Sequence, residues 1–552
     1  MNIKSSLYRI ALSILISALW LGPALGQTKA LQNTEELNSF FDSLAVAKMD
    51  SLNIPGLTMV LLNRDSILYS GGWGYADLEE GRPATPDKTV WRLASISKVV
   101  TGTAVMQLVE RGLVELDTNI NEYLTSVEIP ETFSEPITLR HLLTHTPGLD
   151  VRCMGKSYRT EEEWEPLSEF IARILPDCVY PPGKIYSYSN IGNALAALVV
   201  EDVTGMDFNE YCIENIFRPL GMRDTSFRIL NHEMKEQLYT GYVYQSGDYI
   251  STLFDYLGDY PAGQLLSTSE DFALFMMAHL NSGSLNGNRI LRAETVEQMH
   301  APQFTHHPEL SGSVGFTFHI SHDRGYKISQ HGGGYMGLST LMQLFPDEGL
   351  GLFVAANVAN SPVLYDISSA LIDDILGAIP EQSAEDGISE DNLPEYDPDV
   401  EKFTGYYRGT RYTRKDISKI FLLIGSISDM KLWSNSDGML MMNDLEGNTR
   451  RLIQTEKGLF KSIDDDYTLA FLLDDNGNPE FALTHGTGAL EKVSAFWSTA
   501  NQSIILPLLI LFFLLTFIGF TAYAILPGSW KSKTRNQSPL QLLRRSSYAA
   551  AT

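Results

Sequence analysis

Strand-like segments stand at both ends of residues 35–376, and helix-like segments fill the stretch between them. Residues 58–62 and 67–70 are apolar runs that flank a polar turn, which is typical of a β-hairpin. A second hairpin of this kind is expected at residues 338–345 and 350–355. A unit whose strands open and close around helices is typical of an antiparallel sheet with an inserted helical lobe. The predicted fold class is therefore α+β, with an antiparallel sheet flanked by helices.

The helices of this unit are expected where apolar residues recur with helical periodicity. They are Ser95–Arg111, Asn190–Thr204, Glu270–Leu280 and an amphipathic helix from after Ser361 to about Leu376. Most of these helices lie between the two hairpins in the sequence. The helical lobe is therefore expected to be an insertion between the strands of the sheet.

The character of the sequence changes after residue 376. Residues 377–400 are polar and acidic, contain Pro380, Pro394 and Pro398 and lack periodicity, so we expect a linker. From residue 401 to residue 495, short β-rich runs alternate with turns at regular spacing. That spacing predicts a small all-β domain, either a barrel or a sandwich.

Residues 1–26 have the layout of a signal peptide. The basic residues Lys4 and Arg9 lie before an apolar run at residues 10–21. Ala-Leu-Gly at residues 24–26 then has the small residues typical of a cleavage site. The run is short for a helix that spans a bilayer, which disfavours the alternative of an uncleaved anchor. We therefore expect the chain to be exported.

Residues 504–526 form an uncharged apolar stretch of 23 residues, long enough to cross a bilayer as one helix. A buried core helix is the alternative, and so long an apolar run fits it poorly. Residues 527–552 carry five Lys or Arg and no acidic residue, so we expect this basic tail to be cytoplasmic. The two ends together predict a single-pass protein of the cell membrane whose folded body is periplasmic or extracellular.

The charge of the chain excludes one class of partner. The formal net charge of the 552 residues is −26, although both ends are basic. Binding of nucleic-acid phosphates requires clusters of Lys and Arg, so an acidic body argues against nucleic acid as a partner.

Three cysteines, Cys153, Cys178 and Cys212, stand in the part expected to be exported, where disulfides can form. Whether Cys153 pairs with Cys178 is left open by their spacing. No zinc pattern uses the cysteines, and His141 and His145, four residues apart, lack an evident third ligand. We therefore expect neither a metal nor a cofactor.

Ser95-Ile96-Ser97-Lys98 is an S-x-x-K pattern at the start of a predicted helix. Residues three apart share one face of a helix, so the Lys98 amine can lie beside the Ser95 hydroxyl. A neighbouring amine can take the proton that makes a serine hydroxyl a poor nucleophile. The pattern alone is weak, because a helix cap beside a solvated lysine has the same appearance.

Two further segments supply partners for this pattern. Tyr188-Ser189-Asn190 precedes a predicted helix, and His331-Gly332-Gly333 precedes an apolar strand. In their order and spacing the three motifs resemble the serine β-lactamase and penicillin-binding protein superfamily. Within it the chain resembles the group of class C β-lactamases and D-alanyl-D-alanine carboxypeptidases, with their esterases and D-aminopeptidases. Residues 142–149 and 261–268 also resemble this group, and the resemblance covers about residues 35–376.

The resemblance implies a role for each motif residue. Ser95 would be the acylated nucleophile, and Lys98 and Tyr188 would share acid–base catalysis, with the charge of Lys98 lowering the pKa of Tyr188. Asn190 would hold Lys98 and the substrate amide, and His331 would line the pocket and contact the substrate or Tyr188. Gly333, in the same motif, belongs with the substrate-binding residues. The N–H groups of Ser95 and Gly334 would form the oxyanion hole.

The third motif departs from the pattern of true β-lactamases, since His331 and Gly332 stand where those enzymes usually carry lysine and threonine. Those two residues bind the carboxylate of a penicillin or of a terminal D-alanine. We therefore expect an exported, membrane-anchored serine hydrolase acting through an acyl-enzyme on an amide or ester, such as a D-residue peptide or cell-wall fragment. The alternatives are a β-lactamase or penicillin-binding DD-carboxypeptidase, and a non-catalytic receptor for cell-wall fragments. Oligomeric state and the role of residues 401–495 stay open.

Overall fold

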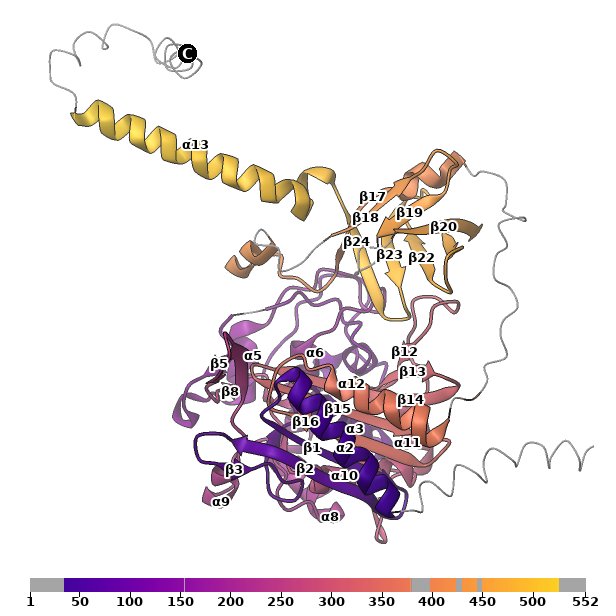
Figure 1. Ribbon diagram of the computed structural model, residues 1–552. Coiled ribbons are helices and arrows are strands. Elements are labelled where there is room, and N and C mark those ends of the chain that lie inside the picture. Colours follow the sequence, from indigo (N-terminus) through magenta and orange to yellow (C-terminus); the bar gives the residue numbers. More distant parts are fainter. Residues whose placement is uncertain are drawn as a thin grey trace, which may run out of the picture.

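The computed structural model describes residues 34–152, 154–377, 379, 398–422, 429–443 and 449–525. Its larger part is built on one antiparallel sheet of eight strands, with helices on both faces and a helical lobe beside it (Figure 1). In their order across the sheet, the strands are β12 (Ser313–Val314), β13 (His319–Asp323), β14 (Tyr326–Tyr335), β15 (Leu338–Phe345), β16 (Leu350–Ala356), β1 (Gly56–Asn63), β2 (Ile67–Asp77) and β3 (Arg82–Pro83). This mixture of antiparallel sheet and helices confirms the predicted α+β class.

The two expected hairpins meet in the middle of this sheet. Strand β1 pairs antiparallel with β16, from Leu57 opposite Ala356 to Asn63 opposite Leu350. Strands β1, β15 and β16 are buried along almost their whole length, because helices cover both faces. A strand buried on both faces reads as a continuous apolar run, which is why these segments do not alternate.

Two helical layers cover the sheet. Helices α2 (Thr34–Leu52) and α12 (Val363–Ala370), with the π-helical turn η6 (Leu371–Leu376), bury apolar side chains on one face. Helices α3 (Ser97–Glu110) and α10 (Ser269–Leu280) belong to the larger core on the other face.

The helical lobe and its loops supply the remaining elements of this body. They are η2 (Ile120–Glu122), α4 (Leu139–Leu143), η3 (Glu161–Glu163), α5 (Leu167–Ile174), α6 (Asn190–Thr204), α7 (Phe208–Cys212), η4 (Ile213–Phe217), α8 (Arg218–Leu220), α9 (His232–Glu236), η5 (Tyr260–Ala262) and α11 (Ala293–Met299). Short strands pair as β4 (Trp91–Arg92) with β9 (Leu266–Ser267), β5 (Ser157–Tyr158) with β8 (Tyr256–Leu257), β6 (Tyr242–Gln245) with β7 (Asp248–Ser251), and β10 (Ser284–Leu285) with β11 (Asn288–Arg289).

Eight further strands close into a barrel that lies above the larger body in Figure 1. They are β17 (Gly405–Gly409), β18 (Met430–Ser434), β19 (Leu440–Asn443), β20 (Thr449–Glu456), β21 (Leu459–Ser462), β22 (Thr468–Leu473), β23 (Pro479–Thr484) and β24 (Gly488–Val493), accompanied by η8 (Pro398–Phe403) and η9 (Ile417–Leu422). The rings of Phe403, Phe460 and Phe471 pack together in its interior. Of the two predicted architectures, the barrel is the observed one, and its closure leaves no open sheet edge.

The barrel is docked on the larger body through both apolar and charged contacts. Tyr180 of the body stacks edge-on against Phe481 of β23, with ring centroids 5.6 Å apart, within a cluster that contains side chains of both parts. Lys184 Nζ lies 2.7 Å from Glu480 Oε2. Both body residues belong to the segment that leads into α6, so the barrel packs beside the second motif.

Helix α13 (Thr499–Ile525) leaves the barrel after η10 (Ala495–Trp497) and extends away from both domains (Figure 1). It is 27 residues long and apolar, and its side chains are exposed, so it is long and apolar enough to span a membrane. The expected signal peptide, Cys153, most of the expected linker, residue 526 and the tail at 527–552 lie outside the described residues. Cys178, the other half of the candidate disulfide, is a free, buried thiol.

Candidate active site

Ser95 lies in a tight 3-10 turn, η1 (Ala94–Ile96), directly before α3. The helix predicted from Ser95 therefore begins two residues later, at Ser97. Ala94 adopts a left-handed conformation with φ of 47°, which costs a residue with a side chain roughly 1–2 kcal/mol. Such strain clusters at functional sites, where the surrounding structure holds it in place.

Strand β14 holds this turn from the other side. Thr340 of β15 donates a hydrogen bond to the Leu93 carbonyl at 2.9 Å, across β14. At Gly333 a Cβ atom would lie 2.1 Å from Thr340 Oγ1 and 2.3 Å from the Leu93 oxygen. Only a glycine leaves room for the strand to approach the turn so closely, so Gly333 has a packing reason to be glycine.

Lys98 is fully buried on the first turn of α3, and its Nζ lies 3.2 Å from Ser95 Oγ. The amine also donates to the carbonyl of Ala262 at 2.6 Å. Burial lowers the pKa of Lys98 well below its usual range, Asp259 opposes this, and Arg411 and Lys156 add to it. A neutral amine in this position can accept the Ser95 proton.

Tyr188 faces the same pair, with Lys98 Nζ 4.8 Å from its ring centroid. Burial raises the pKa of Tyr188 to about 12, while interactions with Ser95 and Arg411 lower it and Asp259 raises it. The net shift of the Tyr188 pKa is therefore upward, opposite to the lowering that the sequence predicted. Burial outweighs the lowering of this pKa by Ser95 and Arg411. A phenol with a raised pKa holds its proton more firmly than a free tyrosine does.

Asn190 is the first residue of α6, and the helix is capped by Ser189, whose hydroxyl accepts from Gly192 N at 2.9 Å. Asn190 lines the cleft, and its Oδ1 has no hydrogen-bond partner among the described residues. The expected contact from Asn190 to Lys98 is thus not formed, because the Ala262 carbonyl holds the amine instead. The amide oxygen is buried without a partner in the part of the chain that the structure describes, although the residue lines the cleft.

His331 is buried on β14 rather than exposed to the cleft. Its Nδ1 donates to the Gly332 carbonyl at 2.8 Å, and its ring lies 6.3 Å from Tyr188 and 5.2 Å from His319, centroid to centroid. Burial, with His319 and Lys98 nearby, lowers the pKa of His331 far below its usual range. The third motif therefore places a neutral ring behind Tyr188 instead of a cation in the cleft.

Ser95, Asn190 and Gly334 line one cleft of about 340 Å³, so the structure brings the three motifs together. Gly334 is exposed, and a Cβ there would meet no atom within 4 Å. Sequence reasoning missed other residues of this site. Lys156 and Asp259 lie in the cleft wall with their charged groups 3.4 Å apart, and Tyr335 lines the same cleft. Around Tyr188 and His331, the missed residues are His145, His319 and Arg411. In the sequence, Asp259 lies two residues before the segment 261–268, and Tyr335 directly follows Gly334. Their closeness to these motifs is the signal by which sequence reasoning could have found them.

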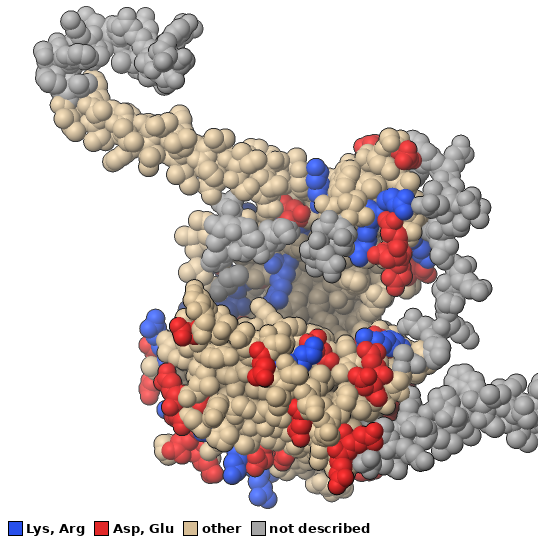
Figure 2. All heavy atoms as spheres, in the orientation of Figure 1, with Lys and Arg blue, Asp and Glu red and all other residues tan. Residues whose placement is uncertain are grey.

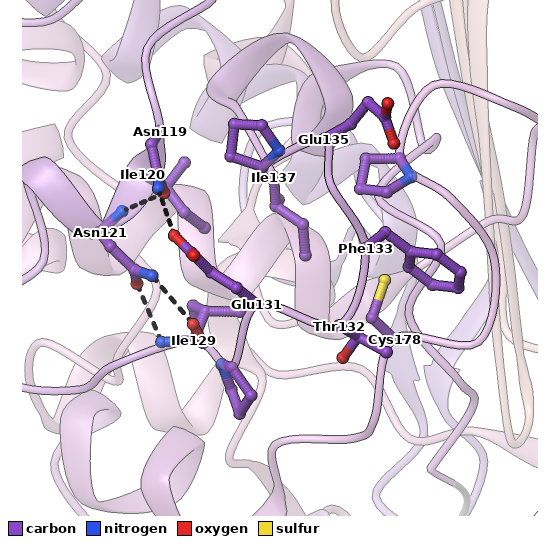
Figure 3. Close-up of a pocket in the computed structure, with 13 residues that line it drawn as sticks. Asn119, Ile120, Asn121, Ile129, Glu131, Thr132, Phe133, Glu135, Ile137 and Cys178 are labelled. Atoms are coloured by element: carbon purple, nitrogen blue, oxygen red, sulfur yellow. Dashed lines mark hydrogen bonds between the residues drawn. The ribbon is translucent and has the colours of Figure 1, made fainter.

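A second hollow lies away from this cleft, around η2 and the loop at residues 129–137 (Figure 3). Its wall is held by Asn121, whose amide spans both backbone groups of Ile129 at 2.9 Å. The volume of this hollow is about 10 Å³, which is room for a single water. It is a packing defect and not a substrate site.

The fold and the meeting of three motifs in one cleft define a member of the serine β-lactamase and penicillin-binding protein superfamily. More narrowly, the Beta-lactamase family matches residues 41–376, and the chain belongs to this family. Protein flp of Staphylococcus aureus strain MW2 is 23% identical over 328 residues, 59% of this chain and 64% of flp. The match thus spans less than two thirds of that relative. The resemblance found in the sequence is confirmed.

Two further likenesses agree with this assignment. A beta-lactamase-like protein of Homo sapiens is 26% identical over 381 residues, which are 66% of this chain and 73% of the human protein. An octameric penicillin-binding protein homologue from Pyrococcus abyssi has a TM-score of 0.53 and 22% identity, over 84% of this chain and 100% of its own. The latter likeness shows the fold, and its coverage extends beyond the family match.

Proposed function

We propose that this protein is an exported, membrane-anchored serine hydrolase that acts through an acyl-enzyme on Ser95. The observation that carries the proposal is the 3.2 Å contact between Ser95 Oγ and a fully buried lysine amine. A lysine that is charged in a buried site costs several kcal/mol, so the amine is held neutral and ready to act as a base.

The chemistry follows from the protonation states. Lys98 accepts the hydroxyl proton while Ser95 Oγ bonds to the substrate carbonyl carbon, and the backbone N–H groups of Ser95 and Gly334 stabilise the oxyanion. Tyr188, whose pKa of about 12 keeps its proton in place, donates to the leaving group, and Lys98 returns a proton to the phenolate. Water then attacks the acyl-enzyme while Lys98 accepts a proton from that water, and Lys98 gives the proton to Ser95 Oγ as the bond between Oγ and the acyl carbon breaks.

The substrate is an amide or an ester, such as a peptide with D-residues or a cell-wall fragment. Asn190 lines the cleft and its buried Oδ1 lacks a partner among the described residues, which supports a substrate with an N–H beside the scissile carbonyl. The neutral, buried His331 disfavours a β-lactam, since it supplies no cation for the β-lactam carboxylate. β-Lactamase or DD-carboxypeptidase activity, and binding of a wall fragment without catalysis, are the competing outcomes of the tests below.

The membrane part of the proposal rests on α13 and on the basic residues that follow it. We place α13 across the cell membrane, with residues 527–552 in the cytoplasm and the cleft on the outer side. An accessibility assay with a membrane-impermeant thiol reagent tests this on variants with a single new cysteine at Ser538 or Ser157. Labelling of intact cells at Ser538 would refute the orientation.

Labelling with a serine-reactive fluorophosphonate, followed by mass spectrometry of the adduct, tests the nucleophile. We expect Ser95→Ala to abolish labelling, whereas Ser157→Ala is the matched control because Ser157 is an exposed serine in the same cleft. Equal labelling of Ser95→Ala and the wild type would refute the proposal. Turnover of a chromogenic cephalosporin would establish the β-lactamase alternative, and saturable wall-fragment binding without any acylation would establish the receptor.

A further inference from the structure

The barrel contributes one side chain to the candidate active site. Arg411 lies in the segment between β17 and η9, and its guanidinium carbon is 4.6 Å from the ring centroid of Tyr188. The barrel belongs to a part of the chain that the Beta-lactamase family match does not cover. A cation is thus brought beside the phenol by a separate domain.

The residues on either side of Arg411 hold its segment against the body. Before it, Thr410 N donates to the Ala489 carbonyl of β24 at 3.1 Å, and Thr410 Oγ1 reaches the Tyr186 carbonyl at 3.5 Å. After it, Arg414 N donates to Asp150 Oδ2 at 3.0 Å. Arg411 is therefore fixed at both ends relative to Tyr188, and its position does not depend on a free loop.

The clamp is strengthened by ion pairs. The Arg414 guanidinium pairs with Asp150 of the body at 3.2 Å and with Glu491 of the barrel at 2.9 Å. Arg414 and both of these partners are largely buried, so little water screens the contacts. These contacts bridge the two parts of the protein within three residues of Arg411.

Arg411 itself has no acidic partner. Among the described residues, nothing accepts a hydrogen bond from its exposed guanidinium or forms an ion pair with it, and its one specific contact is the Tyr188 ring. The other cations near the cleft are already engaged, since Lys156 faces Asp259 and Lys98 is buried against Ser95. Figure 2 shows Lys and Arg side chains inside the hollow between the barrel and the body, while acidic side chains gather on the outer surface.

We propose that Arg411 binds a carboxylate of the substrate close to the scissile bond, so that the enzyme selects anionic amides or esters over neutral ones. A guanidinium presents paired N–H donors that match a carboxylate, and an exposed one that lies over the Tyr188 ring without an acidic partner in the described chain is suited to bind an anion. It lies over the Tyr188 ring and not at the third-motif position that His331 occupies. This inference rests on the proposed hydrolase function, and it assigns the specificity to the barrel domain.

The test compares two substrates that share one scissile bond and differ only in a neighbouring group, a free carboxylate or its primary amide. For full-length Arg411→Gln in detergent, we expect kcat/KM for the anionic substrate to fall roughly 10- to 100-fold, the range for a lost hydrogen bond to a charged group. The value for the neutral substrate should change less than about threefold, and Arg411→Lys should restore part of the preference. Lys415→Gln, which removes a charge from the same exposed segment, is the control and should keep the wild-type preference.

Three outcomes would overturn the inference. Equal losses for both substrates, together with a shifted pH profile, would mean that Arg411 tunes Lys98 and Tyr188 rather than binding a carboxylate. An unchanged preference would mean that the guanidinium has no part in recognition. Absence of fluorophosphonate labelling in the wild type would refute the hydrolase function and this inference with it, whereas normal labelling of Arg411→Gln separates a specificity failure from a failure of the nucleophile.

Discussion

Three consecutive glycines of β14 allow the geometry of the site to be tested by adding one methyl group at a time. Gly333→Ala would place a Cβ 2.1 Å from Thr340 Oγ1 and 2.3 Å from the Leu93 oxygen, whereas ordinary contacts begin at 3.4 Å. The strand must then retreat by about 1 Å from the turn that carries Ser95. Overpacking of this kind typically costs about 1–3 kcal/mol of folding free energy.

The same displacement should be far more costly for the reaction. Moving the strand, with Gly334, about 1 Å from the turn that carries Ser95 is enough to lower a rate roughly 100-fold, because reacting groups must be held close to their productive geometry. We therefore expect Gly333→Ala to keep a cooperative thermal transition, at a lower midpoint, and to lose most of its rate of fluorophosphonate labelling. Circular dichroism and a labelling time course on the full-length protein measure the two effects.

The neighbouring glycines are the matched controls. At Gly332 the nearest atom to an added Cβ is 3.7 Å away, and at Gly334 nothing lies within 4 Å. Both alanine variants should unfold within about 0.5 kcal/mol of the wild type, as is usual for exposed substitutions. If Gly333→Ala matches Gly332→Ala in both stability and labelling rate, then close packing of β14 on the turn is not what positions Ser95.

Three further predictions follow from the protonation states and the domain contact. Since burial lowers the pKa of Lys98 and the neutral amine is the base, Ser95 labelling should rise with pH and level off below the ordinary lysine range of about 10.4; a rise that continues through that range would contradict the assignment. Tyr188→Phe should lower kcat for an amide roughly 10²- to 10⁴-fold with little change in KM, while labelling by a phosphonate with a good leaving group falls less. A Tyr188→Phe variant with unchanged kcat would remove the phenol from the mechanism. At Gly486 of the barrel an added Cβ would lie 1.6 Å from a backbone oxygen of the body, so Gly486→Ala should loosen the docking and speed proteolysis between the domains. The control, Gly409→Ala, adds a methyl group where nothing lies within 4 Å, and equal proteolysis of the two variants would show that docking does not depend on this contact.

The sequence predicted the secondary structure that depends on the periodicity of neighbouring residues. The two central hairpins and the helices at α6 and α10 follow from apolar runs and periodicity, because each side chain's environment repeats with the secondary structure. The start of α3 was placed two residues early, since the left-handed Ala94 creates a separate turn that no sequence pattern announces.

The site was predictable in its members but not in its electrostatics. Ser95, Asn190 and Gly334 do line one cleft, as their motifs indicated. The direction of the Tyr188 pKa was missed because burial depends on residues packed from several elements. Arg411 was out of reach for a stronger reason, since its position depends on how a second domain docks.

The short connection between the barrel and α13 has a consequence for where this protein can act. Only residues 494–498 separate β24 from α13, and Arg408 and Asp429 of the barrel hydrogen-bond the Trp497 carbonyl and the Thr499 N–H at 2.6 and 2.7 Å. The start of the helix is therefore hydrogen-bonded to the barrel as well as linked to it by the chain. With α13 in a bilayer, the cleft would be held at one height and in one orientation above the surface, so the enzyme would work on molecules that enter that layer and ignore those beyond it.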